Sequence, residues 1–165
     1  MSVKNLGIIG GGQLGSLLAV AAKKLNINTI IYCDDADAPA QNFCNKFIHG
    51  RYDDKVKMQE FIKEIDVVTY EFENIPYETL NEMNKIKPVL PKPSVNRLIQ
   101  HRIAEKDFVN KLNIRTTRYA SIENKSDMEP LGDFLPGILK TTTMGYDGKG
   151  LSLIHISEPT RRCYI

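Results

Sequence analysis

The segment Leu6-Gly7-Ile8-Ile9-Gly10-Gly11-Gly12-Gln13-Leu14-Gly15 decides the fold of this chain. Its apolar part, residues 6–9, is typical of a short buried strand that ends in a glycine turn. After the turn, apolar residues recur at helical spacing on one helix face: Leu14, Leu17, Leu18, Ala21, Ala22 and Leu25. A buried strand, a glycine turn and a helix, in that order, begin a Rossmann-like sheet.

The same alternation of strand and helix continues along the chain as far as residue 90. Further strands are predicted near residues 29–32, 47–49, 67–70 and 88–90, and helices over 56–65 and 76–83. Alternation at this spacing implies a parallel sheet that is covered on both faces. The fold class is therefore α/β, with a Rossmann-like parallel sheet.

A second domain is expected after a group of prolines at positions 88, 91 and 93. The first domain would then span residues 1–92, and residues 93–150 would be the truncated beginning of the second. The second segment contains, in order, helices near 94–100 and 103–112, an extended stretch over 115–120, an acidic loop and a strand over 137–140.

Composition excludes several classes of protein. The chain has 165 residues, 42% of them apolar and 25% charged, with a formal net charge of +2. This balance gives no electrostatic case for a nucleic acid or a membrane as partner, and no apolar run approaches the roughly 20 residues that span a bilayer. The three cysteines form no CxxC pair and indicate thiols in a reducing cytoplasm. The histidines lack metal-ligand spacing, so no metal site is predicted.

The glycine turn has the chemistry of an anion site. Gly10, Gly12 and Gly15 fit the pattern G-x-G-x-x-G between a strand and a helix, and Asp34 lies 22 residues after Gly12. Glycines let the backbone approach a phosphate, and a helix N-terminus offers free N–H groups. Taken alone, this pattern predicts a dinucleotide-binding domain of an oxidoreductase. The alternative is a tight turn that needs glycine for packing only.

Two carboxylates follow the strand predicted at 67–70. Glu71 and Glu73 lie within Tyr70-Glu71-Phe72-Glu73-Asn74, at the end of the sheet where α/β proteins bind ligands. Carboxylates there can accept hydrogen bonds from ribose hydroxyls or an exocyclic amine. The alternative is a solvated acidic turn.

A third candidate site lies near the end of the chain. Lys140 closes a predicted strand, and the loop Gly145-Tyr146-Asp147-Gly148-Lys149-Gly150 follows. A lysine beside a glycine-rich loop suits the phosphates of a nucleotide, although no Walker pattern is present. The alternative is a β-hairpin turn with an ordinary surface lysine.

Together these motifs resemble one family, the ATP-grasp carboxylases of purine biosynthesis that act as 5-(carboxyamino)imidazole ribonucleotide synthases. The resemblance covers residues 5–150. It is carried by Gly10–Gly15, by Thr69–Asn74, by Gln100-His101-Arg102 with Glu105-Lys106, and by Lys140 with Gly145–Gly150. It implies a pre-ATP-grasp domain followed by the beginning of an ATP-grasp domain.

The resemblance also implies an activity. An enzyme of this family converts ATP, bicarbonate and 5-aminoimidazole ribonucleotide into the N-carboxylated ribonucleotide, ADP and phosphate. Implied with it are magnesium, whose acidic ligands would lie beyond residue 150, a cytoplasmic location and a homodimer. The chain by itself would then be inactive. The alternatives are an NAD(P)-binding oxidoreductase domain and a ligand-binding module without catalysis.

Site residues follow from the matched motifs. The resemblance assigns the ribonucleotide to five residues: Gly12, Gln13, Leu14, Glu71 and Glu73. It assigns ATP to Arg102, Lys140, Gly145, Tyr146, Asp147, Gly148, Lys149 and Gly150, with Tyr146 and Lys149 also at the carboxylation site. Three positions depart from the family pattern: Ser16 replaces a basic residue, His101 an aspartate and Met144 a glycine.

The last residues differ in character from the rest. Residues 151–161 read LSLIHISEPTR and resemble the translation of a transposase-type sequencing adapter. We therefore expect 151–165 to be a non-native tail that packs poorly or forms a strand beside residues 138–140. The alternative is a genuine strand over 151–156.

Overall fold

The chain forms two compact units, residues 1–99 and 100–165, in a computed structural model that describes residues 4–145 and 150–154. The first unit holds a four-stranded sheet in the order β3-β2-β1-β4, with every neighbouring pair parallel. Its strands are β1 (Asn5–Ile9), β2 (Asn28–Cys33), β3 (Lys46–His49) and β4 (Val67–Tyr70). The predicted α/β class with a parallel sheet is confirmed.

Helices cover both faces of this sheet. They are α1 (Gln13–Lys24) and the short 3₁₀ helix η1 (Pro39–Asn42) on one face, and α2 (Lys55–Lys63) and α3 (Tyr77–Asn84) on the other, while α4 (Pro93–Ile99) packs beside α3. The strand expected at 88–90 is reduced to a single parallel bridge between Val68 and Val89. The loop before α4 contains Pro91 and leads into a helix that belongs to the first compact unit.

Alternating side chains of the strands supply two hydrophobic cores. Ile9 of β1 and Tyr32 of β2 face α2 and α3, where Phe61 and Leu80 are fully buried. Ile8 and Ile31, one residue earlier on each strand, face Ala19 of α1 and Ala40 of η1. Because successive side chains of a strand point to opposite faces, this pattern places α1 and η1 on one side and α2 and α3 on the other.

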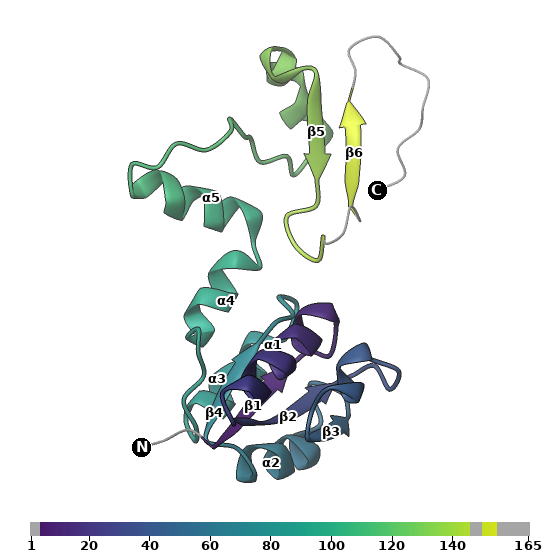
Figure 1. Cartoon of the computed structure of the whole chain (residues 1–165). Coiled ribbons are helices and arrows are strands. Elements are labelled where there is room, and N and C mark those ends of the chain that lie inside the picture. The colour runs from purple at the N-terminus through teal and green to yellow at the C-terminus, as the bar shows by residue number, and fades with distance from the viewer. Residues whose placement is uncertain (1–3, 146–149, 155–165) are drawn as a thin grey trace. The chain divides into compact units, whose positions relative to one another are not determined.

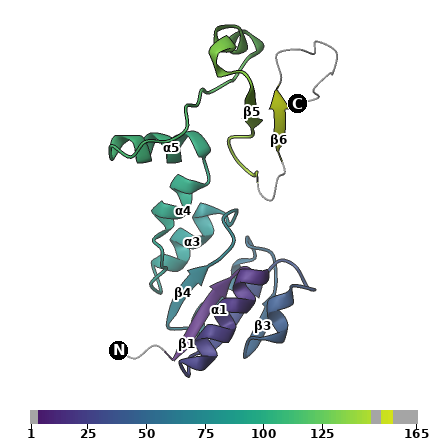
Figure 2. The ribbon, with the colours of Figure 1, turned by 45° about the horizontal axis from the view of Figure 1, so that its top comes forward.

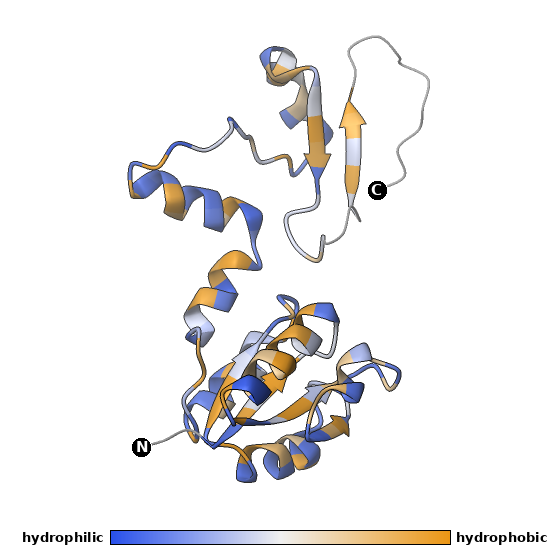
Figure 3. Ribbon diagram, in the orientation of Figure 1, coloured by the Kyte–Doolittle hydropathy of each residue, from blue (hydrophilic) through white to orange (hydrophobic). Residues whose placement is uncertain are grey.

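Helix α1 forms where the apolar periodicity predicts it, but with a different face toward the sheet. Its buried residues are small ones: Gly15, Ser16, Ala19 and Ala22. Leu14, Leu17 and Leu25 are 59%, 58% and 71% exposed. Figure 2 shows α1 running along the sheet, and in Figure 3 its ribbon is largely in the hydrophobic colour. The apolar face identified in the sequence is thus mostly exposed, because only small side chains fit between this helix and the strands.

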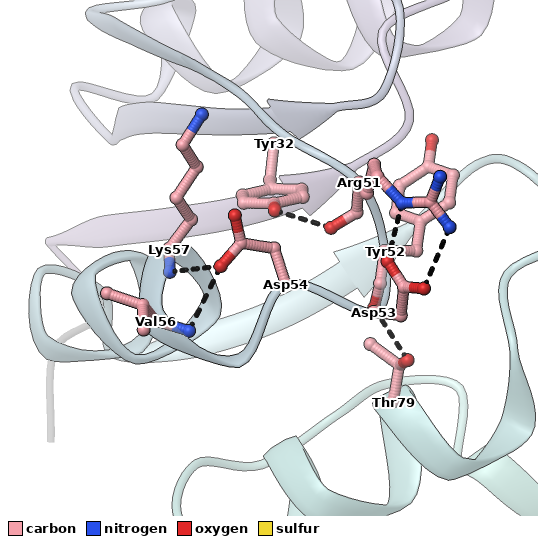
Figure 4. A network of polar contacts seen from close by, with 8 residues as sticks. All are labelled: Tyr32, Arg51, Tyr52, Asp53, Asp54, Val56, Lys57 and Thr79. Carbon is pink, nitrogen blue, oxygen red and sulfur yellow. Dashed lines mark hydrogen bonds and ion pairs between the residues drawn. The ribbon is translucent and has the colours of Figure 1, made fainter.

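A polar network connects β2 to α2 and α3 (Figure 4). Tyr32 donates a hydrogen bond to the carbonyl of Arg51 at 2.7 Å, and Thr79 of α3 donates to the carbonyl of Tyr52 at 2.8 Å. Burial, with Asp54 nearby, raises the pKa of Tyr32 to about 12. Asp54 caps α2, because its carboxylate accepts from the amides of residues 56 and 57 at 3.1 Å. The network fixes the connection between β3 and α2.

The second unit is smaller and less buried. It contains α5 (Arg102–Lys111), the 3₁₀ helix η2 (Lys125–Phe134) and an antiparallel pair of strands, β5 (Gly137–Lys140) and β6 (Leu151–Ile154). Figure 3 shows α5 mostly in the hydrophilic colour, and none of its residues is buried. The segment expected to be an acidic loop forms η2, because Asp127 and Asn124 make a capping box at its start.

The last described strand, β6, pairs with β5. This pairing is expected both for a non-native tail that forms a strand beside residues 138–140 and for a genuine strand of the protein. Leu153 is 68% exposed and Leu151 48% exposed, so the strand buries little apolar surface. Among the described residues, no helix has both the length and the apolar character needed to cross a membrane.

Candidate functional site

The glycine turn and the first carboxylate meet at one edge of the sheet. Strands β1 and β4 are parallel neighbours, with Ile9 opposite Tyr70, so the residues that follow them leave the sheet side by side. The amide of Glu71 donates to the carbonyl of Ile9 at 3.0 Å, and the amide of Gly10 donates to the carbonyl of Tyr32 at 2.9 Å. Gly12 and Glu71 therefore lie at one edge of the sheet, as a single ribonucleotide site that contains both residues requires.

The carboxylate of Glu71 contacts the start of helix α1. Its Oε1 accepts a hydrogen bond from the amide of Gly12 at 2.8 Å, and Gly12 is the N-cap residue of that helix. Amides at a helix start have no partner within the helix and carry partial positive charge. The carboxylate that follows β4 thus satisfies part of the anion site that the glycine turn creates, while no hydrogen bond within the described residues engages its Oε2.

This contact requires glycine at the turn. Gly10 has φ +102°, and a Cβ there would lie 2.7 Å from Oε1 and 2.9 Å from Cγ of Glu71. A Cβ on Gly15 would lie 2.9 Å from the carbonyl oxygen of Gly10. The G-x-G-x-x-G pattern therefore serves here to admit a carboxylate of the same chain and to bring α1 close to β1.

The other residues predicted for this site lie around the same turn. Gln13 and Leu14 begin α1 with exposed side chains, and Glu73 is exposed in the segment after β4. Asp34 follows β2 and is exposed as well, and its carbonyl lies 3.3 Å from Nε2 of His49. Strands β1, β2 and β4 therefore all deliver polar groups to one edge of the sheet.

Two groups near this edge were not identified from the sequence. The hydroxyl of Tyr52 donates to the buried thiol of Cys33 at 3.9 Å, and burial raises the pKa of Tyr52. Asn96 of α4 is fully buried, and its Nδ2 donates to the carbonyl of Glu73 at 2.9 Å. A buried asparagine in a short helix gives no periodic signal, so only the folded chain shows what it contacts.

The second group of predicted residues lies in the second unit. The amide of Arg102, at the start of α5, donates to the carbonyl of Thr142 at 2.9 Å. The amide of Thr141 donates to the carbonyl of Gly150 at 3.1 Å and closes the hairpin after Lys140. Arg102 and the segment from Lys140 to Gly145 are thus held together. Tyr146, Asp147, Gly148 and Lys149 lie outside the described residues.

The three unusual positions have local structural roles. Ser16 is buried, and its hydroxyl donates to the carbonyl of Gly12 at 3.0 Å, so this side chain faces the sheet. His101 caps α5, because its Nδ1 accepts from the amide of Ala104 at 3.3 Å, as an aspartate would. Met144 has φ +59°, a conformation that favours glycine.

A metal site is not present within the part of the chain that the structure describes. No group of three His, Cys, Asp or Glu side chains there is arranged to hold a metal ion. The described residues therefore do not fit magnesium.

Comparison with known families gives one match for the first unit. Residues 3–100 match the family model described as the ribonucleotide synthetase preATP-grasp domain. The match covers the glycine turn, the acidic segment after β4 and Asn96.

Individual proteins of known name extend this likeness to most of the chain. The N5-carboxyaminoimidazole ribonucleotide synthase of Brucella melitensis is 37% identical over 160 residues, which cover 96% of this chain and 44% of that protein. The crystal structure of an N5-carboxyaminoimidazole ribonucleotide synthetase in complex with ADP is 34% identical with a TM-score of 0.86, covering 93% of this chain and 41% of its own.

A third protein is similar in structure at lower identity. The N5-carboxyaminoimidazole synthase of Aspergillus clavatus, solved with ADP and 5-aminoimidazole ribonucleotide, is 25% identical with a TM-score of 0.77. The match covers 92% of this chain and 40% of that one. This chain therefore spans less than half the length of each of the three proteins.

Proposed function

This chain belongs to the family of ribonucleotide synthetase preATP-grasp domains, and on that premise we propose that it serves the ATP-dependent carboxylation of 5-aminoimidazole ribonucleotide. The product would be the N-carboxylated ribonucleotide of purine biosynthesis, and the enzyme class an ATP-grasp ligase. Relatives named for this reaction and a structure solved with the same ribonucleotide support the proposal.

One observation carries the assignment of the ribonucleotide to the first unit. The Glu71 carboxylate is fixed at the start of α1 by its hydrogen bond to Gly12 and lies at the ligand-binding edge of the sheet. Oε1 is held by the turn, so Oε2 is the atom that would accept a hydrogen bond from a ribose hydroxyl or the exocyclic amine. Gln13, Leu14 and Glu73, around the same turn, complete the proposed ribonucleotide site.

ATP would bind in the second unit. The Lys140 ammonium and the Arg102 guanidinium would neutralise charge on the phosphates during phosphoryl transfer to bicarbonate. Gly145–Gly150 would cover the reacting groups, with Tyr146 and Lys149 at the carboxylation site. Carboxyphosphate hydrolyses readily, so such a cover would have to exclude water. The backbone bonds from Arg102 to Thr142 and from Thr141 to Gly150 support this grouping.

The proposal also includes magnesium as the metal that acts with ATP, bicarbonate as a second substrate, and the cytoplasm as the location of the protein. Magnesium would have to be held by residues outside the described ranges, because the described residues offer no ligand cluster for it. The free thiols of Cys33 and Cys44 favour a reducing compartment such as the cytoplasm.

A ligand titration tests the proposal against an NAD(P)-binding domain. We expect the chain to bind 5-aminoimidazole ribonucleotide saturably and NADH not at all in isothermal calorimetry. A dinucleotide needs the α1 amides for its pyrophosphate, and the Glu71 carboxylate holds the Gly12 amide and repels an anion. If NADH bound saturably and the ribonucleotide displaced it, the chain would instead be an NAD(P)-binding oxidoreductase domain. A parallel titration with ATP tests the third alternative, which is a ligand-binding module without catalysis.

A homodimer is the remaining part of the proposal. Leu17, Leu18 and Leu25, on α1 and at its C-terminal cap, are exposed leucines outside the proposed ribonucleotide site, and two copies could bury them by packing against each other. We expect Leu17→Glu to convert a dimer to a monomer in sedimentation equilibrium. Val56→Glu, at a position 69% exposed on α2, is the matched control and should leave the mass unchanged. A wild-type chain that sediments as a monomer would exclude this interface.

A further inference from the structure

The acidic segment after β4 is held at more than one point. At its start, Glu71 bonds to β1 through its amide and to Gly12 through its carboxylate. Two residues later, the carbonyl of Glu73 accepts a hydrogen bond from Asn96 Nδ2 at 2.9 Å. Asn96 is 23 residues further along the chain, on α4, so this bond joins the segment to a separate helix.

Asn96 is an unusual residue for its position. Its side chain is 0% exposed, although asparagine is mostly found at protein surfaces. A buried amide is unfavourable unless its polar atoms are bonded, and Asn96 Oδ1 has no partner. An apolar side chain would fill the space without this cost. What the asparagine adds is the hydrogen bond to the backbone of Glu73.

The acidic segment contains further buried polar atoms beside the two glutamates. The hydroxyl of Tyr70 and the Nδ2 of Asn74, at either side of the two glutamates, are also buried without a partner. Burial raises the pKa of Tyr70. Buried polar groups therefore lie on both sides of the two glutamates, and the Asn96 bond to Glu73 joins the segment to α4.

We propose that Asn96 is a positioning residue for the ribonucleotide site: it holds the Glu73 peptide, and thereby keeps Glu71 and Glu73 in place at the edge of the sheet. Only one residue separates the two glutamates, so movement of the Glu73 peptide moves Glu71 away from Gly12. This inference rests on the proposed ribonucleotide site for its ligand readout. It has a second readout that needs no ligand, which is the Glu71–Gly12 hydrogen bond itself.

The test compares two variants that each remove one side-chain bond to a backbone carbonyl of the first unit. Asn96→Leu removes the bond to Glu73, and Thr79→Val removes the 2.8 Å bond to Tyr52 with little change of shape. The first measurement is hydrogen exchange of the Gly12 amide. We expect exchange at least 10-fold faster in Asn96→Leu and unchanged in Thr79→Val, when both are compared with wild type.

The second measurement is the Kd for 5-aminoimidazole ribonucleotide. We expect it to rise about 10-fold in Asn96→Leu and to stay within twofold in Thr79→Val. Unchanged Gly12 exchange in Asn96→Leu, or equal effects of both variants, would overturn the positioning role. If Asn96→Leu does not fold, Asn96→Ala replaces it with the same expectations. If wild type binds no ribonucleotide, the proposed function fails, and the exchange measurement still decides the role of Asn96.

Discussion

Gly10→Ala is expected to destabilise the first unit and to displace the Glu71 carboxylate. Gly10 has φ +102°, and a Cβ would lie 2.7 Å from Oε1 of Glu71. An alanine in that backbone conformation costs about 1–3 kcal/mol. Losing the hydrogen bond from Gly12 to the carboxylate adds about 1.5–3 kcal/mol. Urea unfolding measures the loss of stability, and calorimetry should show ribonucleotide affinity lowered as well.

Gly132→Ala provides the control for this substitution. A Cβ at Gly132 meets no atom within 4 Å, so the free energy of unfolding should change by no more than about 0.5 kcal/mol. If Gly10→Ala left both stability and ribonucleotide affinity at the wild-type values, the claim that this turn requires glycine because it lies against Glu71 would be wrong.

Glu71→Gln is expected to weaken ribonucleotide binding while leaving ATP binding intact. The substitution keeps the volume of the side chain but removes its charge. Hydrogen bonds to charged groups contribute about 1.5–3 kcal/mol, which is roughly 10- to 150-fold in Kd. Lys140→Ala should do the reverse, because Lys140 lies at the end of β5 in the second unit. Calorimetric titration of both ligands into both variants gives the four constants needed.

Glu60→Gln is the matched control for the loss of a carboxylate. Glu60 is an exposed residue of α2, so its replacement should change neither constant. The proposed division of labour would be contradicted if Glu71→Gln and Lys140→Ala both impaired ATP binding alone.

Local patterns were sufficient to predict most elements of the first unit. The β-branched run at 67–70 forms β4 over Val67–Tyr70, and the helix expected to begin at Pro76 is α3, with Pro76 as its N-cap. Proline before a helix and apolar runs between polar turns act within a few residues, so they can be interpreted without the rest of the chain. The parallel class also places the carboxyl ends of β1 and β4 at one edge of the sheet, and the structure shows that the two strands are direct neighbours there.

Other features depend on distances between segments far apart in the sequence. The leucines of α1 predict the helix but not its orientation, because a Cβ on Gly15 would lie 2.9 Å from the Gly10 carbonyl and only small residues fit against the sheet. G-x-G-x-x-G predicts an anion at the start of α1 but not that this anion is Glu71, which lies 59 residues from Gly12.

The sequence by itself determined the parallel α/β fold of this chain and the residue types at its ligand-binding edge, since periodicity and turn chemistry are local. Only the tertiary structure decided which atoms meet there. Glu71 accepts a hydrogen bond from Gly12, and Asn96 bonds to Glu73 from α4, which follows α3 along the chain. Such contacts form because packing brings together polar groups that are far apart in the sequence, and a buried polar group is more stable when it bonds to a partner that the fold places beside it.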